Sequence, residues 1–378
     1  MESLRKNDVG DLLFNEEEKN KEDRGRKGKE KVYQVLFATL ILLLLFSMTV
    51  SIMLGPISIS PFTVWKIALS KVPFIENLII QDWAKAQEQI IWEIRFPRVI
   101  LGAIVGAGLA IVGVAIQALV RNSLADPFIL GVSSGASVGA TLVIIFGAFK
   151  LFGQYALSLA AFLGAMISVF LVFLVAQVNG RISTVRLLLS GIAISMMLSA
   201  MTSYIVISAP REEGMRDALF WMMGSLAGAK WEQLSIPFFS LLMGIGLLLF
   251  FARPLNLLLM GEQTASTLGL NIDIFKKILM LVTALLTGVL VAVSGAIGFI
   301  GLMVPHVVRL FVGSDHRYVL PVSALIGAIF LIWADVVARI IVAPQELPIG
   351  IVTALCGGPF FIWLLRRNSY SFGEGDGK

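Results

Sequence analysis

The sequence predicts an all-α membrane protein that crosses the bilayer about ten times. Hydrophobic residues make up 57% of the 378 residues, and charged residues make up 15%. Soluble domains average about 45–50% apolar and about 25% charged residues. A chain this apolar cannot bury its surface in one water-soluble core, so the bilayer must be part of its solvent. The 35 glycines suit helices that pack closely in lipid.

Ten apolar segments account for this prediction, since a spanning helix needs about 20 mainly apolar residues. They lie at residues 33–54, 99–120, 128–149, 155–177, 187–208, 234–252, 278–297, 299–312, 319–342 and 349–365. The segment 299–312 is short and follows its neighbour almost directly. We therefore expect a short or broken helix that is buried in protein or lines a cavity. Nine crossings is the alternative count.

The charged ends of the chain predict its domain boundaries and orientation. Residues 1–31 contain nine Lys/Arg and nine Asp/Glu, which predicts a disordered cytoplasmic segment. A transmembrane domain over 32–368 and a short cytoplasmic tail over 369–378 follow. Basic residues flank the first and last spans, so both termini are expected in the cytoplasm. The external loop 209–233 contains Trp221 and Trp231 and predicts a short interfacial helix.

Few residues could supply an energy source or a metal site. The sequence contains no G-x-x-x-x-G-K-[ST] phosphate-binding loop. Asp335 is the only carboxylate within the ten segments, and Arg339 follows it on the same helical face. This pair is either structural or a proton relay of an ion-coupled carrier. One cysteine and two histidines predict neither a metal site nor a cofactor.

Two polar segments could bind other proteins. Arg95-Phe96-Pro97-Arg98 begins the second span, and Arg339 lies near the same outer surface. These arginines either extend to lipid headgroups or dock carboxylates of an external protein. The internal segment 253–271 contains RPLNLLLMGEQTASTLGLN. Gly261 and Gly269 would bound short helices there, which form either a plain connection or a surface for a partner.

Small residues also recur within the third span. Gly131, Gly135 and Gly139 are spaced four residues apart, with serines between them. Such spacing allows two helices to approach closely. The two interpretations are packing within the chain and lining of a lumen by small hydroxyl groups.

Five motifs, in order, resemble the FecCD-type permeases, the membrane subunits of ABC importers for ferric siderophores, haem and vitamin B12. They are RFPRVILGAIVGAGLAIVGVAIQALVRNSLADPFILGVSSGA at 95–136, GEQTASTLG at 261–269, GFIGLMVPHVVRL at 298–310, DHRYVLP at 315–321 and ADVVARIIVAPQELPIGIVTALCGGPFFIWLL at 334–365. The resemblance covers about 33–367. It implies a type II ABC importer permease fold with ten helices per chain.

The resemblance also implies roles for particular residues. Docking of an external binding protein falls on Arg95, Arg98 and Arg339. Coupling to the ATPase falls on Gly261, Glu262, Ala265, Leu268 and Gly269. The cytoplasmic gate falls on Ser183, Thr184 and Val185, where Val185 departs from a hydroxyl of the vitamin B12 member.

The implied function is that of a permease subunit of an ATP-driven importer. It would move iron–siderophore-type cargo across the cytoplasmic membrane of a bacterium, with vitamin B12 or haem as alternative cargo. An ion-coupled secondary transporter is the alternative class. The expected partners are ABC ATPase subunits, an extracytoplasmic binding protein and a second, identical or similar permease chain, with no nucleic acid. The chain itself is expected not to be an enzyme, because ATP hydrolysis belongs to the ATPase subunits.

Overall fold

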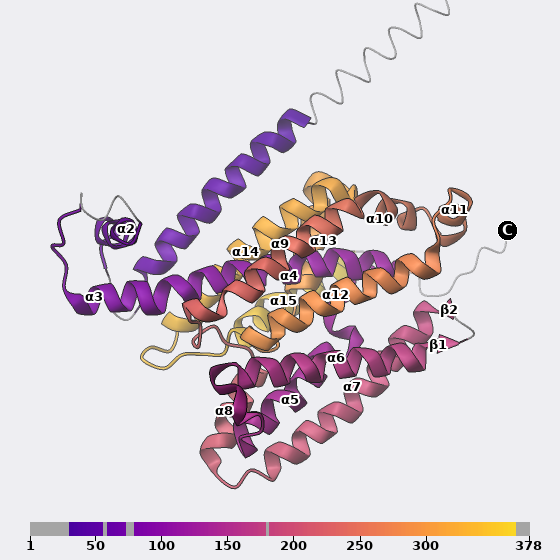
Figure 1. Ribbon diagram of the computed structural model, residues 1–378. Helices are drawn as coiled ribbons and strands as arrows, with labels where there is room; N and C mark the ends of the chain where they lie inside the picture. The colour runs from indigo at the N-terminus through magenta and orange to yellow at the C-terminus, as the bar shows by residue number, and fades with distance from the viewer. Residues whose placement is uncertain (1–29, 56–58, 73–78, 179–180, 368–378) are drawn as a thin grey trace, which may run out of the picture. The chain divides into compact units, whose positions relative to one another are not determined.

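The computed structural model describes residues 30–55, 59–72, 79–178 and 181–367 (Figure 1). The predictions for residues 1–29 and 369–378 lie outside the described residues. The chain divides into two units, Met1–Leu43 and Leu44–Lys378, whose boundary falls inside the helix Glu30–Met53. The first unit contributes the described helical residues 30–43. All features below belong to the second unit.

The described residues contain a helix for each of the ten predicted spans, so the all-α prediction is confirmed. Eight helices are long and apolar enough to cross a membrane, and two shorter apolar helices accompany them. After Glu30–Met53 they are α4 (Phe96–Val120), α5 (Val132–Phe146), α6 (Ala156–Ala176), α7 (Thr184–Ile207), α9 (Ser235–Phe250), α12 (Ile272–Ser294), α13 (Ile300–Val312), α14 (His316–Ile340) and α15 (Ile349–Arg367).

Short elements occupy the connections between these helices. They are α2 (Pro61–Ser70), α3 (Lys85–Gln89), the π-helical η2 (Ile90–Arg95), η3 (Pro127–Leu130), η4 (Lys150–Tyr155), α8 (Glu212–Met222), η5 (Trp231–Gln233), α10 (Ala252–Leu259) and α11 (Glu262–Thr267). The antiparallel strands β1 (Gln177–Val178) and β2 (Arg181–Ile182) precede α7. Helix α8 confirms the helix predicted within 209–233.

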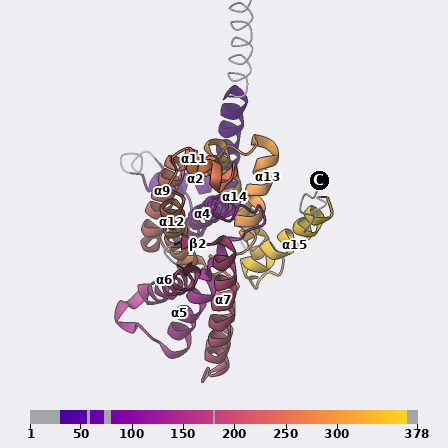
Figure 2. The same ribbon diagram turned by 90° about the vertical axis from the view of Figure 1, so that its right-hand side faces the viewer.

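Helix α4 is the central element of this unit. It packs against α14, α13, α12 and α9, which surround it in Figure 2. Glycines allow this close packing because a side chain would collide with the neighbouring backbone. A Cβ on Gly106 would lie 2.2 Å from the Gly327 carbonyl oxygen, and a Cβ on Gly113 would lie 1.9 Å from that of Gly301.

Helix α13 is short and largely buried, as predicted for 299–312. Pro305 lies inside it and has no N–H to donate to the carbonyl of Gly301 one turn earlier. Gln117 of α4 compensates: its Nε2 donates to the Gly301 oxygen at 3.2 Å and to the Leu302 oxygen at 3.1 Å. A buried amide side chain therefore satisfies the backbone that the proline leaves open.

The small residues of α5 serve packing within the chain. A Cβ on Gly135 would lie 2.3 Å from the Gly164 oxygen, and a Cβ on Gly139 would lie 2.0 Å from the Ala160 oxygen, both on α6. At the start of α5, the Ser168 hydroxyl of α6 donates to the Gly131 carbonyl at 2.8 Å. These contacts support the packing interpretation of the four-residue spacing over the lumen interpretation.

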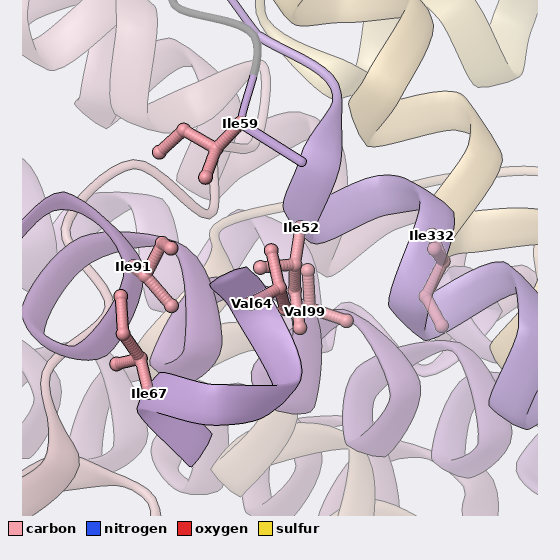
Figure 3. Packing of buried hydrophobic residues seen from close by; sticks show 7 residues of the cluster. All are labelled: Ile52, Ile59, Val64, Ile67, Ile91, Val99 and Ile332. Carbon is pink, nitrogen blue, oxygen red and sulfur yellow. The ribbon is translucent and has the colours of Figure 1, made fainter. Parts of the chain in front are cut away.

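A compact apolar cluster holds the end of the helix Glu30–Met53 against its neighbours (Figure 3). It brings together side chains from that helix and the following segment, from α2 and η2, and from α4 and α14. Its buried members are Ile52, Ile59, Val64, Ile67, Ile91, Val99 and Ile332. The same helix ends carry the arginines predicted to dock a partner.

Candidate functional site

A buried ion pair joins the beginning of α4 to the end of α14. Arg98 Nε and Nη2 each lie 2.9 Å from Asp335 Oδ1. Arg339, one turn after Asp335, places its Nε 3.0 Å from Asp335 Oδ2. The Asp335 side chain is 2% exposed, so two guanidinium groups replace the water that its charge has lost. The predicted pairing of Asp335 with Arg339 is confirmed, and Arg98 is an additional partner.

Arg339 and Arg95 also bind the end of the helix Glu30–Met53. Arg339 Nη1 donates to the Leu54 carbonyl at 2.9 Å, and its Nη2 donates to the Ser51 carbonyl at 3.1 Å. Arg95 Nη1 donates to the Ile52 carbonyl at 2.7 Å. The last carbonyls of a helix have no partner within it, and they form the negative end of its dipole. The guanidinium groups satisfy both needs.

Glu346 completes the arrangement from the segment between α14 and α15. Its Oε1 lies 2.9 Å from Arg98 Nη1, and its side chain is 37% exposed. Sequence reasoning missed this residue because it lies outside the predicted spans and no local pattern pairs it with Arg98. We call Arg95, Arg98, Arg339, Asp335 and Glu346 the charge cluster. Its three guanidinium groups and two carboxylates leave one formal positive charge.

The arginines of the charge cluster are buried in the protein rather than displayed on its surface. Each of the three is 5–6% exposed. Their nitrogens bond within the chain, so they hold three helices together at one end of the unit. Glu346 is the one partly exposed member, and it lies beside Arg98.

The segment predicted to couple to an ATPase forms two short helices, α10 and α11. Gly261 and Gly269 bracket α11 with positive φ angles of 110° and 90°, which glycine adopts without a Cβ clash. Glu262 Oε1 lies 2.7 Å from Lys276 Nζ of α12, and Ala265 is fully buried. Leu268, by contrast, is 60% exposed. The segment is thus anchored on one side and presents an apolar side chain on the other.

The predicted gate residues begin α7, directly after the β1–β2 ribbon. Ser183 is the N-cap, but its side chain makes no capping hydrogen bond. Thr184 is the first helical residue and is partly buried, and Val185 is 64% exposed. Further along α7, Met196, Met197 and Tyr204 are also exposed. This helix therefore keeps one face uncovered in the single chain.

The charge cluster and the α10–α11 segment lie at opposite ends of α14. Arg339 is near the C-terminal end of α14, whereas Asp315 at its N-cap accepts a hydrogen bond from Asn256 of α10 at 2.8 Å. At about 1.5 Å per residue, the 24 residues between Asp315 and Arg339 span about 36 Å. This exceeds the ~30 Å hydrocarbon core of a bilayer, so the two sites belong to opposite membrane surfaces.

The residues that the structure describes form no candidate metal site. They contain no group of three or more His, Cys, Asp or Glu side chains arranged to hold an ion. One cavity carries two carboxylates, Glu88 and Glu93, but Lys71 and Lys85 share its lining. Another, of about 270 Å³, is lined mainly by small and apolar residues, namely Met223, Ala296, Gly298, Phe299, Gly350, Ile351 and Ala354.

The described part of the chain has ten apolar helices, an ion-paired cluster at one membrane surface and a short helix pair at the other, which together define a polytopic membrane transport protein. The chain belongs to the FecCD transport family, which matches residues 42–367. The resemblance seen in the sequence motifs is thereby confirmed, and the chain is a permease of this ABC importer family.

Individual relatives agree with this assignment. The chain is 48% identical over 277 residues to the cobalamin import system permease protein BtuC of Halobacterium salinarum, covering 73% of each chain. It is 42% identical over 302 residues to the Fe(3+)-citrate import system permease protein YfmD of Bacillus subtilis, covering 79% of this chain and 87% of the relative.

Solved structures share the fold. One, described as an inward-facing conformation of a metal-chelate type ABC transporter, is 34% identical with a TM-score of 0.76. The match covers 89% of this chain and 99% of that one. A second, PsaBC from Streptococcus pneumoniae in complex with Fab, is 18% identical with a TM-score of 0.50, a likeness of fold alone.

Proposed function

We propose that this permease moves iron–siderophore-type cargo through the bacterial cytoplasmic membrane, driven by ATP hydrolysis in a separate subunit. The main support is family membership over 42–367, together with similarity to an Fe(3+)-citrate permease and to a metal-chelate transporter. Cobalamin is the second candidate cargo, because a cobalamin permease is 48% identical. Both cargoes are large metal chelates.

The ATPase is proposed to bind at α10 and α11. The sequence lacks the phosphate-binding loop, so hydrolysis must occur in another chain. Gly261 and Gly269 shape the segment, Glu262 and Ala265 anchor it, and Leu268 offers an apolar contact to the partner. Force applied there would reach α12 through the Glu262–Lys276 pair and α14 through Asn256 and Asp315.

A second permease chain is proposed to cover the exposed face of α7. The exposed methionines and Tyr204 of this face, with the hydroxyls of Ser199 and Ser203, are less apolar than the exposed faces of α6 and α9. Cargo would then pass between two α7 helices, and the gate at Ser183, Thr184 and Val185 would close the path at the end nearer the ATPase. Both termini would lie on that cytoplasmic side.

An external binding protein is proposed to dock at the charge cluster. Its one excess positive charge suits an acidic partner. Because Arg95, Arg98 and Arg339 are buried, a partner carboxylate would reach Arg98 by taking the place of Glu346, whose side chain is exposed enough to move aside. The same arginines would keep their structural contacts through Asp335 and the backbone carbonyls.

Affinity purification of the tagged chain in mild detergent, with mass spectrometry of its companions, tests the assembly. We expect a phosphate-loop ATPase and one or more permease chains. The reconstituted assembly would then take up ferric siderophore, ferric citrate or cobalamin only with ATP inside the vesicles. ATP-independent uptake that a protonophore abolishes would instead establish a secondary transporter with Asp335 as its relay.

A further inference from the structure

A second, mostly apolar cavity of about 340 Å³ opens between α6, α9 and α12. Cavities of this size hold small molecules in many proteins. Both α6 and α9 pack against α12, and the cavity lies where α6 and α9 begin and α12 ends. Neither the gate, nor the α10–α11 segment, nor the charge cluster contributes a residue to its lining.

The lining changes character with depth. Its surface is almost entirely apolar, and its polar residues lie at one end, which we call the mouth: Tyr155 and Gln233, just before α6 and α9, and Ser158 in the first turn of α6. None of these three side chains has a hydrogen-bond partner among the described residues. The seven residues from Tyr155 to Phe162 descend about 10 Å at 1.5 Å per residue. At that depth the lining is Phe162 and Val289, and it is wholly apolar.

The surface around the cavity is that of a lipid-facing wall. On α9, Ile236, Phe239 and Met243 are 60–67% exposed, and on α6, Ile167 and Phe170 are 58–59% exposed. Large apolar side chains exposed on spanning helices contact acyl chains. The ten residues that line the cavity carry no charge, so it does not suit an ionic cargo.

We propose that this cavity is a binding site for one membrane glycerophospholipid. The acyl chain would lie along Phe162, Val289 and Ala292. The ester and glycerol oxygens would meet the hydroxyls of Tyr155 and Ser158 and the amide of Gln233. Because the mouth is uncharged, the site selects the backbone common to these lipids and not a headgroup charge.

Native mass spectrometry tests the site on the full chain incubated with equal amounts of phosphatidylethanolamine and phosphatidylglycerol. We expect one lipid to be retained at collision energies that remove the rest, with the two headgroups bound within about twofold of each other. The variant Ile236→Trp fills the mouth from an exposed position and should lower the retained fraction at least fivefold. Phe239→Trp, equally exposed on the same helix but outside the lining, should leave it unchanged.

A second variant probes the polar mouth without adding bulk. Gln233→Leu should lower retention severalfold, since an ester oxygen loses its donor. Loss of retention in Phe239→Trp to the same extent as in Ile236→Trp would overturn the site, as would retention of phosphatidylglycerol alone. Absence of any retained lipid in the unaltered chain, or a second copy of the chain in its place, would also overturn it.

Discussion

Arg98 and Asp335, which lie 237 positions apart in the sequence, form a buried ion pair that joins α4 to α14. Asp335 also receives Arg339, so removing its charge would leave two guanidinium groups with reduced compensation. Breaking a buried pair from one side commonly costs about 3–5 kcal/mol, because the remaining charge stays buried. The first expected effect of breaking this ion pair is therefore a loss of stability.

Asp335→Leu is expected to lower the unfolding temperature of the detergent-solubilised chain by several degrees. The double variant Arg98→Leu with Asp335→Leu should recover part of that loss, because it removes one of the two uncompensated charges. Asp217→Asn on exposed α8 is the matched control. An unchanged unfolding temperature in Asp335→Leu would show that the pair contributes no net stability.

Glu346→Gln tests the exchange of carboxylates proposed for docking. Loss of the competing charge should strengthen binding of the external protein about fivefold, or roughly 1 kcal/mol, measured by calorimetry at low salt. Arg98 keeps Asp335 in this variant, so the fold is preserved. Glu232→Gln, an exposed change on η5, should have no effect. Weaker binding in Glu346→Gln would mean that Glu346 itself contacts the partner.

Gly113→Ala tests the close approach of α4 to α13. Its new methyl group would lie within 2 Å of the Gly301 carbonyl oxygen, so the helices must separate and the packing at Gln117 is disturbed. Overpacking of this kind costs about 1–3 kcal/mol. Gly246→Ala on α9, where nothing lies within 4 Å, is the control. Equal thermal stability of the two variants would contradict the packing at this crossing.

Leu268→Asp tests the apolar contact proposed for the ATPase. The side chain is exposed, so the chain should fold and insert normally while recovery of the ATPase falls at least tenfold, about 1.4 kcal/mol of binding. Leu268→Met conserves the volume and should retain the ATPase. If Leu268→Asp co-purifies with the ATPase at the normal ratio, the contact surface lies elsewhere.

Asp315, the N-cap of α14, makes the stability of the chain depend on pH. Partial burial opposes ionisation, but hydrogen bonds from Arg317 and Asn256 outweigh it and lower the pKa to about 2 from 3.8. A lowered folded-state pKa stabilises the protein above the unfolded value, and the benefit is lost as pH falls from about 4 to 2. Asp315→Asn should thus be less stable at pH 7 by about 1–2 kcal/mol, and the gap should close toward pH 2. A gap that persists at pH 2 would assign the effect to helix capping alone.

The ten helices could be predicted from the sequence because the bilayer imposes a length and an apolar composition that each span must carry locally. The same holds for the glycine spacing of α5 and for the breaks at Gly261 and Gly269, since these depend on single residues and their near neighbours. The pairing of Asp335 with Arg339 was predictable for the same reason, as the two lie one helical turn apart.

Contacts between distant segments could not be predicted in this way. Glu346 has no local signal, yet it binds Arg98 across 248 positions, and Gln117 compensates for Pro305 on another helix. The burial of Arg95, Arg98 and Arg339 was equally invisible, because it depends on where the helix Glu30–Met53 ends. The lipid cavity also exists only where α6, α9 and α12 meet.

The sequence by itself therefore determined the number of helices, the family and most residues of the candidate sites. Only the tertiary structure decided that the arginines face carboxylates and helix-end carbonyls, and that Leu268 stays exposed while Ala265 is buried. The physical reason is that hydropathy and helical periodicity act over a few turns. The cost of burying a charge or a carbonyl is met by whichever distant group the packed helices bring within hydrogen-bond distance.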